Sequence, residues 1–451
     1  MYLTCRSLLN ALVAACCFAV GLSHAKEPPE SSILFENVRI FDGKTTTLSP
    51  PSNLLVRGNT IQKISADPIT LEGQAGTVVI KGEGHTLMPG LIDAHWHATM
   101  AALPLQVLMT ADIGYINLAA GKQAQATLMR GFTSVRDLSG PTFGLKRAID
   151  DGLVEGPRIW PSGAMISQTG GHGDFRLPYE VPTARNAPLN RGEAINGGVI
   201  ADGPDEVRKR VREQLMLGAS QIKLAAGGGV SSFYDPIDVS QYTEAEFRAA
   251  VEAAENWGTY VTVHAYTPRA IKTAIAGGVK SIDHGHLLDE ETVKLMAEKG
   301  IWLTLQPFLD NEFSNPQTGE ARVKQLQVYA GTDNAYKLAQ KHNLKLAWGT
   351  DILFNPRMVN RQGAILASMT RWYEPAEVLR MATSTNAELL QLSGPRNPYA
   401  GNLGVIEEGA LADLLLVDGN PIDNIQLIAD PDKNFVVIMK DGKVYKNSVK
   451  Q

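Results

Sequence analysis

Short apolar stretches separated by tight turns characterise both ends of the chain. In each stretch, hydrophobic and polar residues alternate or form a brief apolar run, which is typical of β-strands. Turn signals follow two of them, Asp42-Gly43 near the start and Asp441-Gly442 near the end. We therefore predict that the two ends pair into one small β-sandwich domain. Its expected strands are residues 33–41, 53–57, 60–64, 77–80, 411–417, 435–439 and 443–445.

Between these ends, apolar stretches of strand length alternate with segments of helical periodicity. Thr243 and Glu246 form a capping-box pattern, and Phe247, Val251 and Ala254 follow at helical spacing. Alternating strands and helices indicate a parallel sheet, so the predicted fold class is α/β, a (β/α)8 TIM barrel with the active site at the carboxyl ends of its strands. The expected barrel strands are residues 87–95, 133–137, 158–162, 221–225, 260–264, 281–284, 302–306 and 345–350.

These patterns predict four segments along the chain. Residues 1–25 are a signal peptide, 26–88 and 396–451 are the two parts of the β-sandwich domain, and 89–395 are the barrel domain. Residues 168–202 are rich in Gly, Pro, Asn and Arg and show no clear period. A structureless loop of that length in a compact domain is usually functional, so this loop is a candidate lid.

The first residues have the pattern of a secretory signal. Arg6 supplies the positive charge, residues 8–22 are mostly apolar but short for a membrane span, and Ala25 is the kind of small residue that precedes cleavage. We predict cleavage after Ala25, a periplasmic or secreted protein, and no membrane span in the mature chain. The alternatives are a retained anchor and a lipoprotein attached through Cys16. All three cysteines lie in this segment, so cysteine is excluded as a ligand or nucleophile of the mature chain.

The charge composition indicates which kind of molecule the protein binds. The 451 residues include 42 Lys and Arg and 47 Asp and Glu, for a net charge of −5, with no basic block. This charge gives no basis for binding nucleic acid. A small-molecule partner is expected instead.

The clearest chemical signal is the end of the first barrel strand. His95 and His97 are two residues apart after an apolar run, so on a strand both point to the same face. A metal ion satisfies two such imidazoles well. On this motif alone, two ordinary histidines explain the pattern as well as metal ligands do.

Four later strand ends carry further polar residues, and each has a simpler explanation when taken alone. Lys223 would be a lysine at the barrel rim, His264 a hydrogen-bonded core histidine, His284 a turn residue and Asp351 a helix cap. Taken together with the His-x-His motif, they lie at the face where barrels hold their chemistry. We therefore predict one shared metal site.

Several longer motifs make the chain similar to a known family. They are Phe41-Asp-Gly43, Pro89-Gly-Leu-Ile-Asp-Ala-His-Trp-His97, Asp283-His-Gly285, Gly349-Thr-Asp351, Thr385-Asn-Ala387 and Gly409-Ala-Leu-Ala-Asp413. Nearly the whole mature chain resembles the amidohydrolase superfamily, in the branch of imidazolonepropionase-like proteins, Xaa-Pro and Xaa-Arg dipeptidases (prolidases) and ochratoxinase-like amidases. The chain departs from the family's pattern at Gln391-Leu-Ser-Gly394, and this difference affects the end of a helix.

The resemblance implies a binuclear site in the barrel domain. His95, His97 and Asp351 would hold one divalent ion, and His264 and His284 the other. Lys223, carboxylated by carbon dioxide, would bridge both ions. Imidazole and carboxylate ligands favour zinc, though not exclusively. By family analogy, the protein is also expected to form homo-oligomers.

The same resemblance implies hydrolysis of an amide bond in dipeptides or N-acyl amino acids, including amides like ochratoxin A. A hydroxide between the two ions would attack the carbonyl, and Asp351 would act as general acid and base. The alternative is a cyclic-amide or imine hydrolase, or a deaminase, of the imidazolonepropionase type. The remaining candidates by position are Tyr266 and His286 for catalysis and His172, Tyr266, Arg269 and Arg357 for substrate binding.

Overall fold

The computed structural model describes residues 32–71, 76–183 and 187–449. The predicted signal peptide at 1–25 and the lipoprotein alternative at Cys16 lie outside these residues. Within the described ranges, no helix is both long and apolar enough to cross a membrane.

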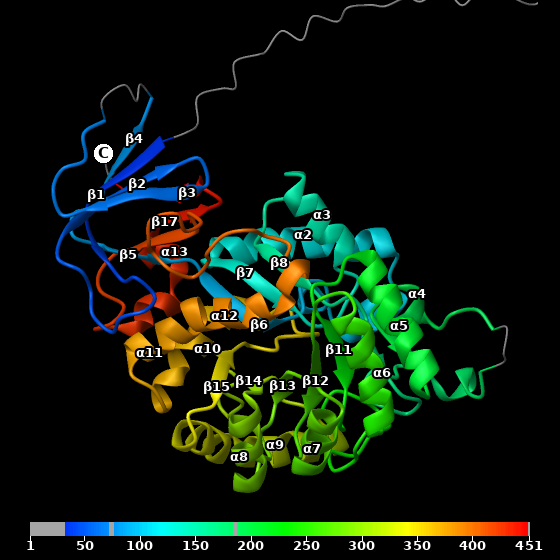
Figure 1. Cartoon of the computed structure of the whole chain (residues 1–451). Helices are drawn as coiled ribbons and strands as arrows, with labels where there is room; N and C mark the ends of the chain where they lie inside the picture. Colours follow the sequence, from blue (N-terminus) through cyan, green and yellow to red (C-terminus); the bar gives the residue numbers. More distant parts are fainter. Residues whose placement is uncertain (1–31, 72–75, 184–186, 450–451) are drawn as a thin grey trace, which may run out of the picture. The chain divides into compact units, whose positions relative to one another are not determined.

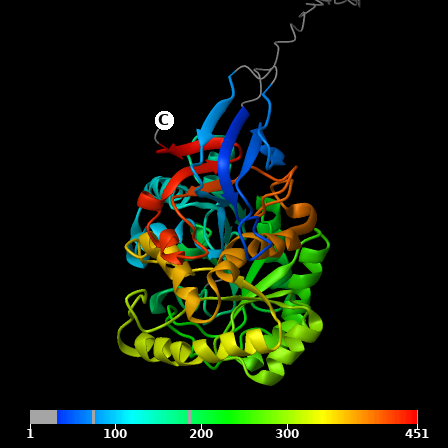
Figure 2. The same ribbon diagram turned by 90° about the vertical axis from the view of Figure 1, so that its left-hand side faces the viewer.

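Strands from both ends of the chain share one mixed sheet of eight strands, in the order β18-β17-β16-β5-β1-β2-β3, with β4 on β1. Met88 of β5 lies opposite Leu415 of β16 in an antiparallel ladder. In Figures 1 and 2 the blue and red strands accordingly lie side by side. The bounds are β1 (Ser32–Ile40), β2 (Ser52–Arg57), β3 (Thr60–Ser65), β4 (Val78–Lys81), β5 (Thr86–Pro89), β16 (Leu414–Val417), β17 (Phe435–Lys440) and β18 (Lys443–Asn447).

The two ends also contribute to one apolar core. Phe35, Leu54, Leu416 and Val437 are fully buried in it. Burial of each such side chain stabilises the folded state by roughly 1.5–3 kcal/mol. Because the core draws on both ends of the chain, neither end would be well packed without the other. The domain boundaries at 88/89 and 395/396 stay a prediction.

The middle of the chain confirms the α/β class. A seven-stranded parallel sheet has the order β10-β9-β11-β12-β13-β14-β15, and a three-stranded parallel sheet has the order β6-β7-β8. Their bounds are β6 (Leu91–Trp96), β7 (Phe132–Asp137), β8 (Arg158–Pro161), β9 (Met165–Ser167), β10 (Gly198–Ile200), β11 (Ile222–Ala225), β12 (Val261–Ala265), β13 (Ser281–His284), β14 (Trp302–Leu305) and β15 (Lys345–Trp348).

Helices follow most of these strands. Thr243 and Glu246 form the expected capping box at the start of α6, and Pro204 at the first turn of α5 suits a position that needs no amide donor. The bounds are α1 (Leu105–Thr110), α2 (Ile113–Met129), α3 (Phe143–Asp150), α4 (Arg191–Ala194), α5 (Pro204–Leu217), α6 (Glu244–Glu255), α7 (Pro268–Ala276), α8 (Glu290–Lys299), α9 (Gly319–Lys341), α10 (Gln362–Ala367), α11 (Pro375–Arg380), α12 (Asn386–Leu390) and α13 (Pro431–Asn434).

Single hydrogen bonds, rather than a ladder, join the two parallel sheets. At one junction the Asp351 amide donates to His95 O at 2.8 Å, and at the other the Ser220 amide donates to Pro161 O at 2.8 Å. The Asn386 amide group donates to Ile92 O and Trp348 O at 2.7 and 2.8 Å. Among the residues that the structure describes, the strands therefore follow barrel order without forming the continuous eight-stranded ladder of an ideal TIM barrel.

Two expectations about this region are corrected. The strand expected at 87–95 is two strands, β5 in the mixed sheet and β6 in the three-stranded sheet. The division falls at Gly90. A Cβ at this position would lie 2.1 Å from the Thr133 hydroxyl oxygen, so the backbone here packs directly against the Thr133 side chain. The stretch 168–202 is also not structureless, since it contains α4 and β10.

Candidate active site

Two imidazoles at the end of β6 converge on one carboxylate oxygen. Nε2 of His95 and Nε2 of His97 lie 3.1 and 3.0 Å from Oδ1 of Asp351. Possible ligand atoms of the three residues all lie within 4.8 Å of one another. Asp351 has a positive φ of 54°, which is uncommon for a residue other than glycine and typical of functional sites. The predicted first metal site is thus brought together by β6 and the segment after β15.

The electrostatics of this group suit a cation. Burial alone would raise the pKa of the Asp351 carboxyl, but the imidazoles of His95 and His97 lower that pKa well below its usual value. The side chain is therefore a carboxylate. On the other side of the ring, Nδ1 of His95 lies 3.5 Å from Oδ1 of Asp283. Two imidazoles and a carboxylate are a donor set that zinc and similar divalent ions accept.

His264 and His284 lie beside this group, at the ends of β12 and β13. The His264 Nε2–H donates to Gly228 O at 3.0 Å, and the His284 Nδ1–H donates to Gln306 Oε1 at 2.7 Å. Each ring therefore keeps one nitrogen for another partner, as metal-binding histidines usually do. Burial lowers the pKa of both rings well below the usual value, so both are neutral, the form that binds metals.

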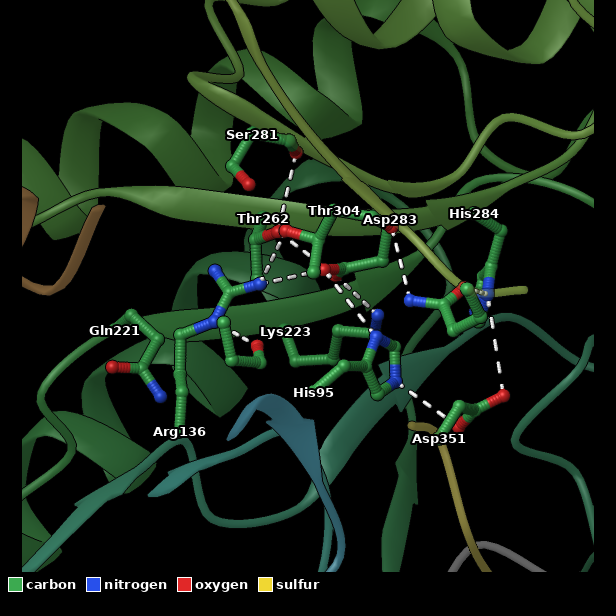
Figure 3. A network of polar contacts seen from close by, with 12 residues as sticks. His95, Arg136, Gln221, Lys223, Thr262, Ser281, Asp283, His284, Thr304 and Asp351 are labelled. Carbon is green, nitrogen blue, oxygen red and sulfur yellow. Dashed lines mark hydrogen bonds and ion pairs between the residues drawn. The ribbon is translucent and has the colours of Figure 1, made fainter. Parts of the chain in front are cut away.

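Lys223 on β11 faces the same space, but its ammonium is ion-paired. Figure 3 shows it directed at Asp283, with Nζ 2.5 Å from Oδ2. Arg136 donates to the other oxygen of Asp283 at 2.7 Å, and Thr262 donates to Oδ2 at 2.9 Å. Burial lowers the pKa of Lys223 despite its acidic partner.

Sequence reasoning missed the roles of Asp283, Arg136 and Gln306. Asp283 lies directly before His284 and Arg136 lies within an apolar strand, so both positions carried a signal of an unusual buried charge. Asp93 was also missed. Its carboxylate accepts from the Thr350 hydroxyl at 2.7 Å and the Gln362 amide at 2.9 Å, which links β6 to the segment that carries Asp351.

A cavity of about 500 Å³ opens onto these side chains. All six predicted metal-site residues line it: His95, His97, Lys223, His264, His284 and Asp351. The remaining wall is largely apolar and aromatic, and includes Phe175, Phe308, Phe313, Tyr329 and Phe354. Such a volume is in the range that holds a small organic ligand.

The other predicted site residues divide into two groups. His172 and Tyr266 line the cavity, and the Tyr266 ring lies 4.9 Å from the His264 ring between centroids. His286 is fully buried behind the stacked ring of Phe308 and is absent from the cavity wall. Arg269 and Arg357 are exposed and also absent from it. The predicted direct roles of these last three residues are therefore not supported by their positions.

The fold and this site define a hydrolase of the amidohydrolase class. The Amidohydrolase family matches residues 86–449, and the chain belongs to this family. Ochratoxinase from Aspergillus niger is 35% identical over 383 residues, which cover 80% of this chain and 75% of the relative.

Solved structures agree with this assignment. An amidohydrolase is similar with a TM-score of 0.84 and 35% identity, covering 93% of this chain and 100% of the other. A prolidase in complex with N-methylphosphonate-L-proline has a TM-score of 0.83 and 33% identity, with the same coverage of 93% and 100%. The predicted membership of the superfamily is confirmed.

Proposed function

We propose that this protein is a metal-dependent amidohydrolase that cleaves the amide bond of dipeptides or N-acyl amino acids. The observation that carries the proposal is the convergence of His95 and His97 on one oxygen of Asp351, at the wall of a largely apolar cavity. Buried imidazoles and a carboxylate in this arrangement form a site for a divalent ion.

The proposed ions would polarise the scissile carbonyl and activate a water molecule for attack. His95, His97 and Asp351 would hold one ion, with zinc favoured, and His264 and His284 would hold the second. Asp351 is ionised and lies at the cavity wall, so its free oxygen can accept the proton of the attacking water. It can then return that proton to the leaving amine.

Tyr266 is the proposed donor to the substrate carbonyl oxygen. Burial raises the pKa of its phenol well above the usual value, so the hydroxyl stays protonated. The ring lies against those of both His264 and His284, with centroids 4.9 and 5.2 Å away. A fixed donor beside the reacting carbonyl stabilises the charge that develops on its oxygen.

Lys223 is proposed to be carboxylated and to bridge the two ions. A neutral amine is the form that reacts with carbon dioxide, and burial lowers the pKa of this amine. Carboxylation would convert a cation that repels metals into an anionic ligand with two oxygens. The proposal is supported by the position of Lys223 on the cavity wall, on the strand next to the one that carries His264.

The substrate class follows from the cavity and the relatives. Its wall carries several aromatic rings, which suit apolar or aromatic side chains on either side of the amide. Ochratoxinase and a prolidase are among the similar proteins. We therefore propose dipeptides and N-acyl amino acids with apolar side chains, including amides like ochratoxin A.

The test combines metal analysis with a substrate panel. Purified protein would be freed of metal, reconstituted with zinc, manganese or cobalt, and assayed on dipeptides, N-acyl amino acids and cyclic amides. We expect two ions per chain and hydrolysis of the linear amides. Activity that survives exhaustive chelation would refute metal dependence. One ion per chain with turnover of only cyclic amides or amidines would instead support the imidazolonepropionase or deaminase alternative.

Export and assembly are proposed on the sequence alone. Cleavage after Ala25 would give a periplasmic or secreted protein, and family analogy favours a homo-oligomer. N-terminal sequencing of the exported protein and light scattering of the purified protein test these two points.

A further inference from the structure

His172 reaches the cavity from the segment after β9 and is held on two sides. Its ring stacks on that of His264, with centroids 3.9 Å apart and planes 20° apart. Its Nδ1 lies 2.8 Å from the Ser232 hydroxyl and 3.7 Å from Oδ2 of Asp235. Since Nδ1 is engaged, Nε2 is the nitrogen left for a ligand in the cavity.

The turn 229–235, which follows β11, is the surface that supports this ring. At Gly229 an added Cβ would lie 1.9 Å from Nδ1 of His172 and 2.0 Å from Cε1. The imidazole therefore packs directly on bare backbone. Any shift of this turn would move both the wall behind the ring and the hydroxyl that holds Nδ1.

Lys324, on helix α9, fixes the turn from outside the site. Its ammonium donates to three carbonyl oxygens of the turn: Gly229 O at 3.2 Å, Ser232 O at 3.1 Å and Asp235 O at 2.8 Å. From the other side, Asp235 Oδ2 accepts from the Gly229 amide at 2.7 Å. One cation thus satisfies three carbonyls of a turn that has no regular backbone ladder of its own.

We propose that Lys324 is a positioning residue that sets the orientation of His172 in the cavity, acting through the turn 229–235 and the Ser232 hydroxyl. Lys324 is absent from the cavity wall, so it acts without touching the substrate. The inference rests on the proposed function in one respect, that His172 contacts the substrate. Such positioning matters because a displacement of about 1 Å in an active site can lower a rate by about 100-fold.

The first measurement needs no substrate. Protein with ¹³C-labelled histidine rings gives one ring signal for His172, assigned by its loss in His172→Gln. We expect this signal to shift or broaden in Lys324→Met and in Ser232→Ala. It should stay in place in Lys337→Met, a matched change at an exposed lysine on the same helix. An unchanged His172 signal in folded Lys324→Met or Ser232→Ala would overturn the inference.

The second measurement uses the best substrate of the hydrolysis panel. Lys324→Met should lower kcat/KM by about 10- to 100-fold with bound metal unchanged. In the His172→Gln background the same change should have an effect below about twofold, because the two residues act as one unit. Equal losses in both backgrounds would show a merely structural lysine and refute the proposal. If no amide is hydrolysed, the proposed function fails, and the NMR result still decides the role of Lys324.

Discussion

Lys223 and Asp283 form an ion pair in the interior of the protein, with Nζ 2.5 Å from Oδ2. Their side chains are 2% and 0% exposed. The Arg136 guanidinium occupies the other carboxylate oxygen at 2.7 Å. With Lys223 in its free ammonium form, one carboxylate therefore compensates two buried cations at the wall of the proposed metal site.

Removing this carboxylate is expected to destabilise the fold strongly. Asp283→Ala leaves the buried guanidinium of Arg136 without its acidic partner, whether Lys223 is a free ammonium or carboxylated. This change should lower the free energy of unfolding by about 3–5 kcal/mol. Urea denaturation measures the change. The control is Asp310→Ala, which breaks an exposed pair with Arg322 and should cost less than about 1 kcal/mol. Equal effects of the two changes would contradict the prediction.

Replacing Asp351 by Asn tests the site without changing its shape. The amide cannot ionise, so zinc binding should weaken and hydrolysis should fall by about 100-fold or more. Zinc raises the Tm of a protein that binds it in the folded state, and this rise should be lost. Asp238→Asn, a change at an exposed carboxylate, should retain both properties. A zinc-dependent Tm in Asp351→Asn equal to that of the wild type would remove Asp351 from the metal site.

Asp137 should make the stability depend on pH. Burial raises the pKa of its carboxyl from 3.8 to about 8, although the Ala98 amide donates to it at 2.7 Å. Between these pH values the folded state holds a proton that the unfolded state has lost. This contribution to stability is therefore complete below about pH 4 and is lost as the pH rises toward 8, by about 1.4 kcal/mol per pH unit.

The variant Asp137→Asn is neutral throughout and lacks this dependence. The free energy of unfolding of the variant minus that of the wild type should therefore grow by about 3 kcal/mol from pH 5 to pH 7. Urea denaturation at both pH values gives the two differences. A difference that stays constant would show that Asp137 is ionised in the folded protein.

Asn386 should be a principal support of the junction between β6 and β15. Its side chain donates to Ile92 O and Trp348 O and accepts from the Trp348 amide at 3.0 Å. Asn386→Leu leaves these buried backbone groups unpaired, and the expected loss of stability is about 3 kcal/mol. As a control, Asn334→Ala removes only a long hydrogen bond to Leu288 O, at 3.4 Å, from an exposed residue of α9, and should change stability by less than about 0.5 kcal/mol. Thermal unfolding of the two variants provides the comparison.

Local pattern was enough to find the residues that face the cavity. His95 and His97 follow from strand alternation, and Lys223, His264, His284 and Asp351 follow from polar residues placed after apolar runs. All six line one cavity. Pattern could not reveal that Asp283 pairs with Lys223, because that contact joins different strands.

The differences between the predictions and the structure have equally local causes. The apolar run across Gly90 gave no sign that the chain passes from one sheet to another there. The strands β9 and β10 have only three residues each, too few to show a period. Exposed loop arginines cannot be separated from ligand-binding ones by sequence, and the structure places Arg269 and Arg357 away from the cavity.

Because β5 pairs with β16, the sheet can be completed only late in the synthesis of the chain. A ribosome releases β5 early, whereas its partner leaves only when most of the chain has been made. Until then, one edge of β5 has no permanent neighbour and is open to association with other chains. The last strands to be synthesised therefore complete the sheet that the first strands began. A chain that stops before Leu414 would lack this partner strand and expose the edge of β5.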